Sequence, residues 1–365
     1  MRRRIEKVII IMFIVFGVVI LWSVFGKKKE GFQDNIWNEK AMEEFYKRFF
    51  RPIDRVHTAY YDNLAQGDNL NKSTRRIMGD LDKYEEQVKR GQNIASKSRL
   101  VITGLIRNNA YQIPEIKQRC QDIVKYFSEY KILIVENNST DGSRDFLLEW
   151  SSEDPNVNIL CKDIFAVNEN ECDILDFFPP SDHLGGSPLP DRIQKMAFLR
   201  NIYIKHTLHY YSNYDFMFVI DFDLRGDLYI DGFLQSVAVL TEQKKIDGIA
   251  CNGMLLKPDA DDFYYYDSFA HIDEGDPIYW ENHAAKSNHD KYVHTYVSQR
   301  YKTNMNLDKV RSAFGGAALY KISSMKNAQY DFSSAYFSCE HSFFHKNKHI
   351  VVNPRFIFMI SQNGA

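Results

Sequence analysis

From Ser98 onward, short apolar segments alternate with amphipathic ones, and this alternation constrains the fold more than any other feature of the sequence. RLVITGLI (99–106), KILIVENN (131–138) and VNIL (157–160) have the length and β-branched content of buried strands. Between the first two, PEIKQRCQDIVKYFSEY opens with a proline near a helix N-terminus and repeats apolar residues on one face. A strand–helix–strand order is typical of α/β proteins. We therefore expect a mixed sheet flanked by helices.

Two acids follow one of the strands directly. The apolar run DFMFVI (215–220), preceded by a long amphipathic helix over 191–211, ends at Asp221, and Asp223 comes two residues later. The segment ENNSTDGS (136–143) follows an earlier strand in the same way. In open α/β sheets, ligands bind beyond the carboxyl ends of the strands. We expect both motifs to face one crevice.

An Asp-x-Asp pair at a strand end offers hard oxygen ligands to Mg2+ or Mn2+, which proteins bind through one or two carboxylates together with substrate phosphates. Such an ion acts as a Lewis acid and stabilises the charge on a departing nucleoside diphosphate. An isolated Asp-x-Asp is more often a solvated turn, so the interpretation depends on the preceding strand and on the second motif. A phosphatase-like site also begins with Asp-x-Asp, but it calls for Thr or Val where this chain has Arg225.

The N-terminus is basic and then strongly apolar. The run from Val8 to Phe25 holds eighteen uncharged residues, with basic residues on both sides. That length can span a bilayer, and it exceeds the ~7–15 residues of a cleavable signal's apolar region. We predict an uncleaved signal anchor over residues 1–29, in a single-pass type II membrane protein whose catalytic domain lies in the lumen of the Golgi or the endoplasmic reticulum. A buried core helix is the alternative.

Residues 30–97 are polar and helix-prone, with apolar faces in NIWNEKAMEEFYKRFF and LDKYEEQVKRG. We interpret them as a helical stem that leads to a catalytic domain over residues 98–365. Helices packed onto that domain as an integral extension fit the pattern equally well.

Composition limits the partners. The net charge of −2, from 46 basic and 48 acidic residues, gives no electrostatic case for binding nucleic acid. The five cysteines are scattered without a C-x-x-C pair, which argues against zinc-ribbon and thioredoxin sites and leaves disulfide pairing open.

Six blocks of the sequence, read in order, resemble one enzyme family. They are VENNSTDGSRDFL, RIQKMAFLRNIYI, FVIDFDL, YYYDSFAHID, SAFGGAALYK and CEHSFFHKNKHIVVNPR, and together they span roughly residues 99–357. Their order and spacing resemble the fungal capsule-associated α-1,3-mannosyltransferases of glycosyltransferase family 69. The resemblance implies a GT-A type nucleotide-sugar-binding fold, one N-terminal membrane helix, and transfer of mannose from GDP-mannose to a glycan acceptor with retention. A UDP-sugar donor and a catalytically silent carbohydrate-binding protein on the same fold are the alternatives.

The resemblance also implies a donor site. Three groups of residues would form it: Glu136, Ser139 and Asp141 at the nucleoside, Arg200 and Asn201 beside the diphosphate, and Asp221 and Asp223 on the Mn2+ or Mg2+ ion.

The C-terminal block supplies candidates for catalysis and for a third metal ligand. Glu340 is our first catalytic candidate, because a carboxylate there could orient or deprotonate the acceptor hydroxyl. The alternative is a structural carboxylate that caps a helix. Of His341, His345 and His349, we expect His345 to close the metal site, since neutral imidazole is an acceptable ligand. An ordinary surface histidine is the alternative for each.

Four more residues are candidates for contact with the sugars. Asp267, in FYYYDSF, could hydrogen-bond sugar hydroxyls and is the second catalytic candidate. Trp280 could stack on the acceptor, although core packing explains most of the aromatic residues in this chain. Gly315 and Gly316 would let the acceptor approach the backbone closely, or would simply form a tight turn.

Overall fold

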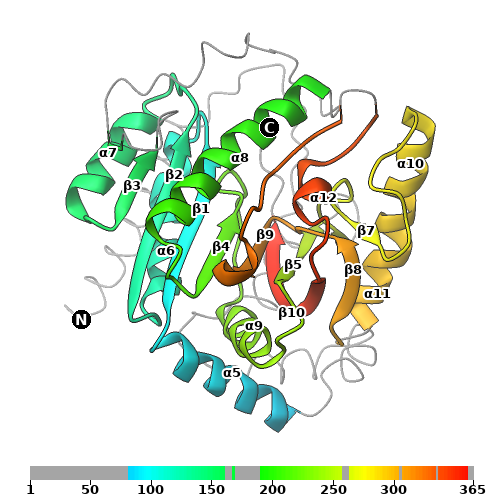
Figure 1. Cartoon of the computed structure of the whole chain (residues 1–365), viewed down its shortest axis with the longest axis horizontal. Coiled ribbons are helices and arrows are strands. Elements are labelled where there is room, and N and C mark those ends of the chain that lie inside the picture. The colour runs from blue at the N-terminus through cyan, green and yellow to red at the C-terminus, as the bar shows by residue number, and fades with distance from the viewer. Residues whose placement is uncertain are drawn as a thin grey trace, which may run out of the picture.

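The computed structural model describes residues 81–160, 167–168, 190–256, 263–303, 306–333 and 336–360 (Figure 1). The predicted anchor over residues 1–29 and most of the predicted stem lie outside the described residues. Among the helices that are described, none has the length and apolar character needed to cross a membrane.

Among the described residues, the strands form one ten-stranded mixed sheet. Its main path runs β3-β2-β1-β4-β9-β5-β10-β8-β7, and β6 pairs with β5 off this path. The strands are β1 (Arg99–Ile106), β2 (Glu129–Glu136), β3 (Val157–Leu160), β4 (Phe216–Ile220), β5 (Gly248–Leu256), β6 (Phe263–Tyr265), β7 (Ile272–Asp273), β8 (Asp308–Ser312), β9 (Ala317–Lys321) and β10 (Ile350–Ile360). The expected mixed sheet is confirmed, and the strands predicted over 99–106 and 157–160 have the observed bounds.

Helices cover both faces of this sheet. The longer ones are α5 (Leu81–Ala95), α6 (Ile113–Val124), α7 (Ser143–Glu153), α8 (Pro190–Tyr210), α9 (Ile230–Glu242) and α10 (His283–Tyr292); α11 (Ser298–Thr303) and α12 (Glu340–Phe344) are short. Figure 1 shows α8 lying across the front of β1 and β2, against which it packs. Because side chains alternate along a strand, Leu100 and Ile102 join the core under α6 and α9, whereas Val101 joins the core under α8.

The strand order reverses beside β1. Strands β1, β2 and β3 run parallel and follow one another toward one edge, and the chain then returns through α8 to place β4 parallel to β1 on its other side. Such a reversal leaves room for a ligand beyond the carboxyl ends of the two strands. β9 then pairs antiparallel with β4 and starts the mixed half of the sheet.

The described end of the predicted stem belongs to this globular unit. Helix α5 packs on α9, where the Tyr84 hydroxyl donates to Asp231 at 3.1 Å. Gly91 lies so close to α9 that a Cβ atom there would come within 1.8 Å of the Leu234 carbonyl oxygen. For Leu81–Ala95, the structure therefore favours the integral extension over a free stem.

Cysteines contribute to the core as thiols. Cys120, Cys251 and Cys339, which are the cysteines within the described ranges, are buried and free. Burial raises the pKa of the Cys120 thiol to about 12, so it stays protonated.

Candidate functional site

The loops that follow β1 and β2 are tied to each other at the carboxyl edge of the sheet. The Ser139 hydroxyl accepts a hydrogen bond from the Asn108 backbone N–H at 2.9 Å, and Asp141 Oδ2 accepts one from the Ala110 N–H at 2.9 Å. Asp141 Oδ1 also accepts from the Ser143 backbone N–H at 3.0 Å. Ser139 and Asp141 therefore brace the edge with their side chains, and their predicted contact with a nucleoside remains a prediction.

Glu136, the last residue of β2, is fully buried. Its carboxylate accepts from the Arg144 Nε at 2.8 Å and from the Ser139 N–H at 2.5 Å. These bonds fix the turn between β2 and α7. Glu136 thus shapes this loop, and its predicted contact with a donor remains a prediction.

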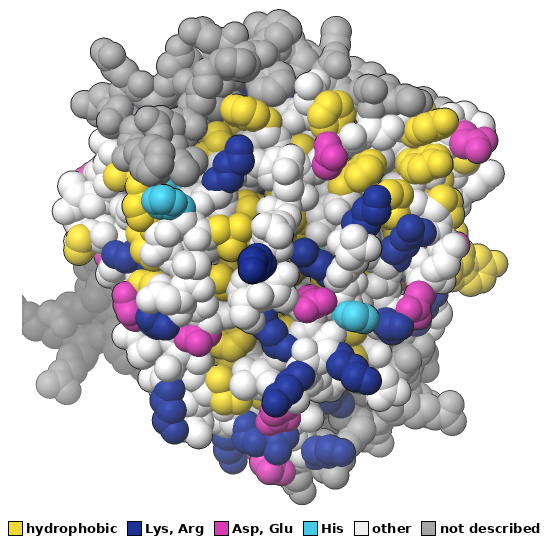
Figure 2. All heavy atoms as spheres, viewed as in Figure 1, with side chains coloured by type: hydrophobic (Ala, Val, Ile, Leu, Met, Phe, Trp, Pro, Cys, Tyr) yellow, Lys and Arg dark blue, Asp and Glu magenta, His cyan; other side chains and the backbone are white. Residues whose placement is uncertain are grey.

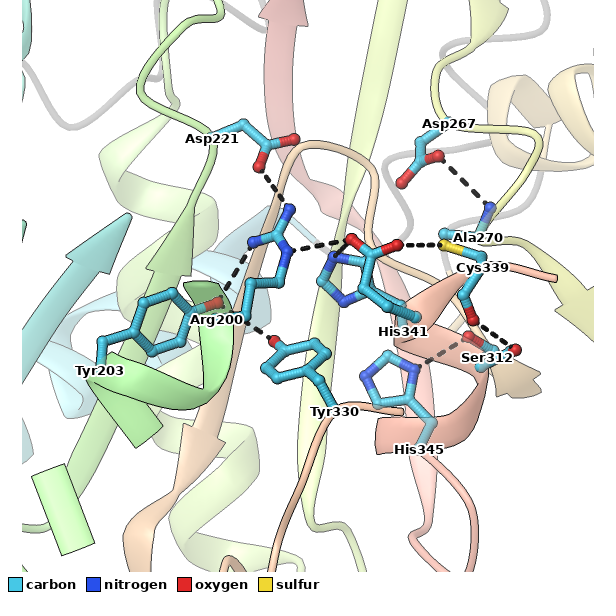
Figure 3. A network of polar contacts seen from close by, with 12 residues as sticks. Arg200, Tyr203, Asp221, Asp267, Ala270, Ser312, Tyr330, Cys339, His341 and His345 are labelled. Atoms are coloured by element: carbon cyan, nitrogen blue, oxygen red, sulfur yellow. Dashed lines mark hydrogen bonds and ion pairs between the residues drawn. The ribbon is translucent and has the colours of Figure 1, made fainter. Parts of the chain in front are cut away.

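Arg200, on α8, is the centre of a buried ion-pair network (Figure 3). Its Nη2 donates to Asp221 Oδ1 at 3.0 Å, and its Nε donates to Glu340 Oε1 at 3.0 Å. The Arg200 side chain is 3% exposed, and those of Asp221 and Glu340 are 19% and 6% exposed. Arg200 thus joins the carboxyl end of β4 to the start of α12, instead of projecting toward a ligand.

More carboxylates gather around Arg200 than its buried guanidinium neutralises. Burial, together with the charges of Asp223 and Glu340, raises the pKa of Asp221 to about 7 against the opposing effect of Arg200. The Asp223 side chain is exposed. The buried carboxylates around Arg200 are therefore short of positive charge, which a cation would supply.

Asp267 lies in the same cluster and is half-buried. Burial, followed by the charges of Asp221 and Glu340, raises the pKa of Asp267 to about 7. Figure 3 shows Asp221 and Asp267 at one end of the network, with Tyr203 and His345 toward the other. Asp267 Oδ1 accepts one long hydrogen bond, from the Ala270 N–H at 3.3 Å. Its backbone has a φ of 64°, a strained region that is frequent at functional sites.

The predicted third metal ligand, His345, is placed differently from the prediction. It is 1% exposed, its Nδ1 bonds the Ser312 hydroxyl at 2.9 Å, and its Nε2 bonds the Tyr320 hydroxyl at 2.8 Å. Both ring nitrogens are thus engaged within the core, and neither is directed to the Asp pair. Burial lowers the pKa of His345 to about 3, so the imidazole is neutral.

His341, another of the three histidines of the C-terminal block, lies beside Glu340. Its ring stacks on Phe314 with centroids 3.9 Å apart, and its Nε2 lies 3.9 Å from Glu340 Oε1. Neither ring nitrogen has a hydrogen-bond partner among the described residues, although the side chain is buried. Burial lowers the pKa of His341, so a neutral imidazole with unused nitrogens borders the carboxylate cluster.

Gly315 and Gly316 form a tight turn within the protein. Their φ values are 63° and 85°, and the Gly316 carbonyl accepts from the Asp221 N–H at 2.9 Å. A Cβ atom on Gly315 would lie 2.3 Å from the Cys251 carbonyl oxygen. Glycine is therefore needed here for contact with β5, and the turn holds Asp221 in place.

Trp280 and Asn201 also have structural partners. The Trp280 side chain is 7% exposed and packs on Phe269 and His289, so it offers little free face to a sugar. The Asn201 side chain donates to the Tyr330 carbonyl at 2.9 Å and accepts from the Tyr330 N–H at 2.8 Å. Asn201 thus holds the chain near α12 onto α8.

Three basic residues at this edge were not predicted. Arg107 directly follows β1, and Arg192 and Lys195 lie in the first turns of α8. Lys195 is 8% exposed, whereas Arg107 and Arg192 are exposed. The block RIQKMAFLRN showed two of them, but helix periodicity alone did not indicate which side of α8 faces the strand ends.

The Asp pair fits an Mg2+ or Mn2+ ion. The described residues contain no group of three His, Cys, Asp or Glu side chains that could hold an ion by themselves. Such ions need only one or two protein carboxylates when substrate phosphates complete the coordination. Asp221 uses one carboxylate oxygen for Arg200, Asp223 is exposed, and the surrounding negative charge favours a cation.

Figure 2 shows the face that α8 crosses. Basic and acidic side chains are interspersed over it, and hydrophobic side chains gather toward its upper part. The charge of the site is therefore a local feature, set by the residues at the strand ends.

No protein-family model and no curated protein matches this chain. Among solved structures, it is similar to the mannosyltransferase PcManGT from Pyrobaculum calidifontis in complex with GDP-Man and Mn2+, with 10% identity, coverage of 80% of this chain and 68% of that one, and a TM-score of 0.39. It is similar to S. aureus TarS in complex with UDP-GlcNAc, with 12% identity, coverage of 73% and 59%, and a TM-score of 0.40. GalNAc-T7 with UDP, GalNAc and Mn2+ gives 10% identity, coverage of 73% and 44%, and a TM-score of 0.43. Similarities this weak do not establish the activity of this chain.

Proposed function

We propose that this chain is a metal-dependent glycosyltransferase of GT-A type, which moves a sugar from a nucleotide-sugar donor to a glycan acceptor. One observation carries the proposal: Asp221 and Asp223 follow β4 at the point where the strand order reverses. They lie there among carboxylates that outnumber the guanidinium of Arg200. This is the place in an α/β sheet where ligands bind, and the charge imbalance calls for a cation.

Asp221 and Asp223 would hold the Mn2+ or Mg2+ ion, which in its bound state neutralises charge on the departing nucleoside diphosphate. Arg200 keeps Asp221 in position through their 3.0 Å ion pair. The Gly316 carbonyl fixes the Asp221 backbone from the other side. His341 is the better candidate than His345 for an additional ligand, because its nitrogens are unused.

The transfer breaks the bond between the anomeric carbon and a diphosphate oxygen, and it forms a bond from that carbon to the acceptor oxygen. The acceptor hydroxyl loses its proton, and Asp267 is suited to accept it. A base works best when its pKa lies near the working pH, and that of Asp267 is raised to about 7. Glu340 is engaged with Arg200, so we assign it to holding that guanidinium.

The proposed donor and cellular location rest on features of the sequence. The six blocks support GDP-mannose as the first-choice donor, transfer with retention, and a UDP-sugar as the second choice. The apolar run from Val8 to Phe25 supports a type II anchor with the domain in the Golgi or endoplasmic reticulum lumen.

Donor turnover by the full-length protein in detergent tests this function. We expect release of the nucleoside diphosphate from GDP-mannose or from one of a panel of UDP-sugars in Mn2+, and none in EDTA. Asp223→Asn should lose this turnover, whereas Asp215→Asn, at the opposite end of β4, should retain it. A protein that binds glycans but consumes no donor in Mn2+ would instead be a carbohydrate-binding protein on this fold.

The two catalytic candidates are separated by paired variants. Asp267→Asn should lower transfer by ~10²–10⁴-fold, the usual contribution of a positioned acid–base group, with donor affinity unchanged. Glu340→Gln should change donor affinity and transfer together, because it disturbs Arg200 and through it Asp221. Calorimetric donor affinity and transfer rates decide the assignment. If Glu340→Gln alone lowers transfer at constant affinity, Glu340 is the base.

A further inference from the structure

We infer that Lys195 and Arg107, with Arg192 beside them, form an anion site that takes the diphosphate of a nucleoside diphosphate. This inference rests on the proposed function and moves the diphosphate contact away from Arg200. The three residues come from the end of β1 and the start of α8, which pack against each other. They therefore meet at the edge where the strand order reverses.

Lys195 is the residue on which the inference depends most. Only 8% of the surface of Lys195 is exposed. No carboxylate among the described residues forms an ion pair or hydrogen bond with it. Burial lowers the pKa of Lys195, and the positive charge of Arg107 lowers it further. Because this mostly buried lysine lies next to a second cation, an anion bound there would offset both the desolvation and the repulsion.

Arg107, after β1, and Arg192, in the first turn of α8, are the other two members of the positive group. Neither forms an ion pair with a described carboxylate, although the charge of Arg192 acts on Asp223. Three arginines elsewhere that are partly or fully buried each have a carboxylate partner: Arg144 with Glu136, Arg119 with Glu115 and Arg300 with Asp273. Lys195 differs from them, because it is buried near the Asp pair without a carboxylate partner among the described residues.

The neighbouring charges select the class of ligand. A simple anion would be repelled by the carboxylates, whereas a diphosphate that shares a divalent cation with Asp221 and Asp223 would satisfy both groups. Lys and Arg side chains bind phosphate oxygens through charge-assisted hydrogen bonds. Arg200 is less suited to this role, because Asp221, Glu340 and Tyr203 take three of its five N–H donors and its side chain is 3% exposed.

The test measures binding of GDP, UDP and inorganic pyrophosphate to the full-length protein in Mn2+, by calorimetry. Lys195→Met keeps the apolar stem and should weaken binding of all three by about 10–100-fold, the effect of one charge-assisted hydrogen bond. Arg107→Gln should have the same direction. Lys205→Met, an exposed lysine further along α8, is the matched control and should bind as wild type does.

A second measurement guards against misfolding. In the unliganded protein, Lys195→Met should not lower the melting temperature, since it removes an uncompensated charge, whereas the upward shift of that temperature caused by GDP or UDP should shrink. Loss of fold in Lys195→Met would contradict the inference, because it would mean that the ammonium supports the unliganded structure.

The outcomes separate this inference from the proposed function. Transfer activity together with wild-type GDP and UDP affinity in both variants would overturn the anion site and leave the glycosyltransferase standing. If the protein transfers no sugar but its pyrophosphate binding depends on Lys195, the anion site stands and the glycosyltransferase function is overturned. If wild type binds neither GDP, UDP nor pyrophosphate, the anion site is wrong.

Discussion

Two arginines of this protein each lie between two carboxylates, and their surroundings differ. Arg300 holds Asp273 through two hydrogen bonds, of 2.8 and 3.0 Å, and Asp308 through one of 2.8 Å. Arg200 gives Asp221 and Glu340 one hydrogen bond each. Arg300 is 30% exposed, whereas Arg200 is 3% exposed.

The acids respond in opposite directions. Burial alone would raise the pKa of Asp273, but hydrogen bonds from Arg300 and Tyr292 outweigh it and lower the pKa to about 2. Burial and neighbouring carboxylates raise the pKa of Asp221 to about 7 in spite of Arg200. Arg300 pairs with both oxygens of Asp273 and satisfies that carboxylate, whereas Arg200 gives Asp221 one bond among other carboxylates and leaves it able to bind a ligand.

The largest expected difference between the two networks is in activity. Asp221→Asn should lower metal-dependent turnover by ~10³-fold or more, because it removes a carboxylate that holds the cation and several kcal/mol of charge stabilisation with it. Asp308→Asn, in the Arg300 network, should leave turnover within a few-fold. Steady-state rates at saturating donor measure both. If both variants lost turnover equally, Asp221 would not be a metal ligand distinct from the acids around Arg300.

Removing each arginine compares the two networks in stability. Arg200→Met leaves Asp221 and Glu340 buried without a partner and should cost ~3–5 kcal/mol, the usual effect of breaking a buried ion pair from one side. Arg300→Met should cost less, because Asp273 and Asp308 are 20% and 24% exposed, whereas Glu340 is 6% exposed. Urea denaturation of both variants gives the two values, and a larger cost at Arg300 would reverse the ranking.

The smallest expected difference between the two networks is in how their acids change the stability of the protein with pH. The folded pKa of Asp273, about 2, is below its ordinary 3.8, so its contribution is present above pH ~4 and is lost as the pH falls toward 2. Asp273→Asn should therefore lower stability by about 2 kcal/mol at pH 7 and progressively less below pH 4.

The contribution of Asp267 to stability depends on pH in the opposite direction. Its folded pKa, about 7, is raised, so the protonated form stabilises the fold and that contribution is lost as the pH rises from ~4 through 7. Asp267→Asn should not lower stability at pH 8 in EDTA. Denaturation curves from pH 3 to 8 give the free energy of unfolding of both variants. If both variants are less stable than wild type at pH 8, negative charge is not in excess around Arg200.

Local sequence was sufficient for the first half of the sheet and for the position of the Asp pair. The apolar runs over 99–106 and 215–220 and the helix between 191 and 211 each have a clear period, so their edges could be located. The short strands β6, β7 and β8 and the antiparallel insertion of β9 depend on pairing between distant segments, which periodicity does not report.

Side-chain roles in the site were harder to predict, because they depend on partners far along the chain. Arg200 meets Glu340, which is 140 residues away, and His345 meets Ser312 and Tyr320 in the core. A motif shows which residue types are present, whereas the fold decides which of them are already bonded. Lys195 illustrates the converse, since only the structure shows that a lysine is buried without an acid beside it.

Helix α5 also has a practical consequence for handling the protein. It covers part of α9, a helix whose residues from Ile230 to Leu240 are nearly all buried. A fragment that starts at Ser98 would uncover that apolar surface, and molecules of the fragment would adhere to one another through it. The shortest fragment that stays dispersed at high concentration should therefore begin before Leu81.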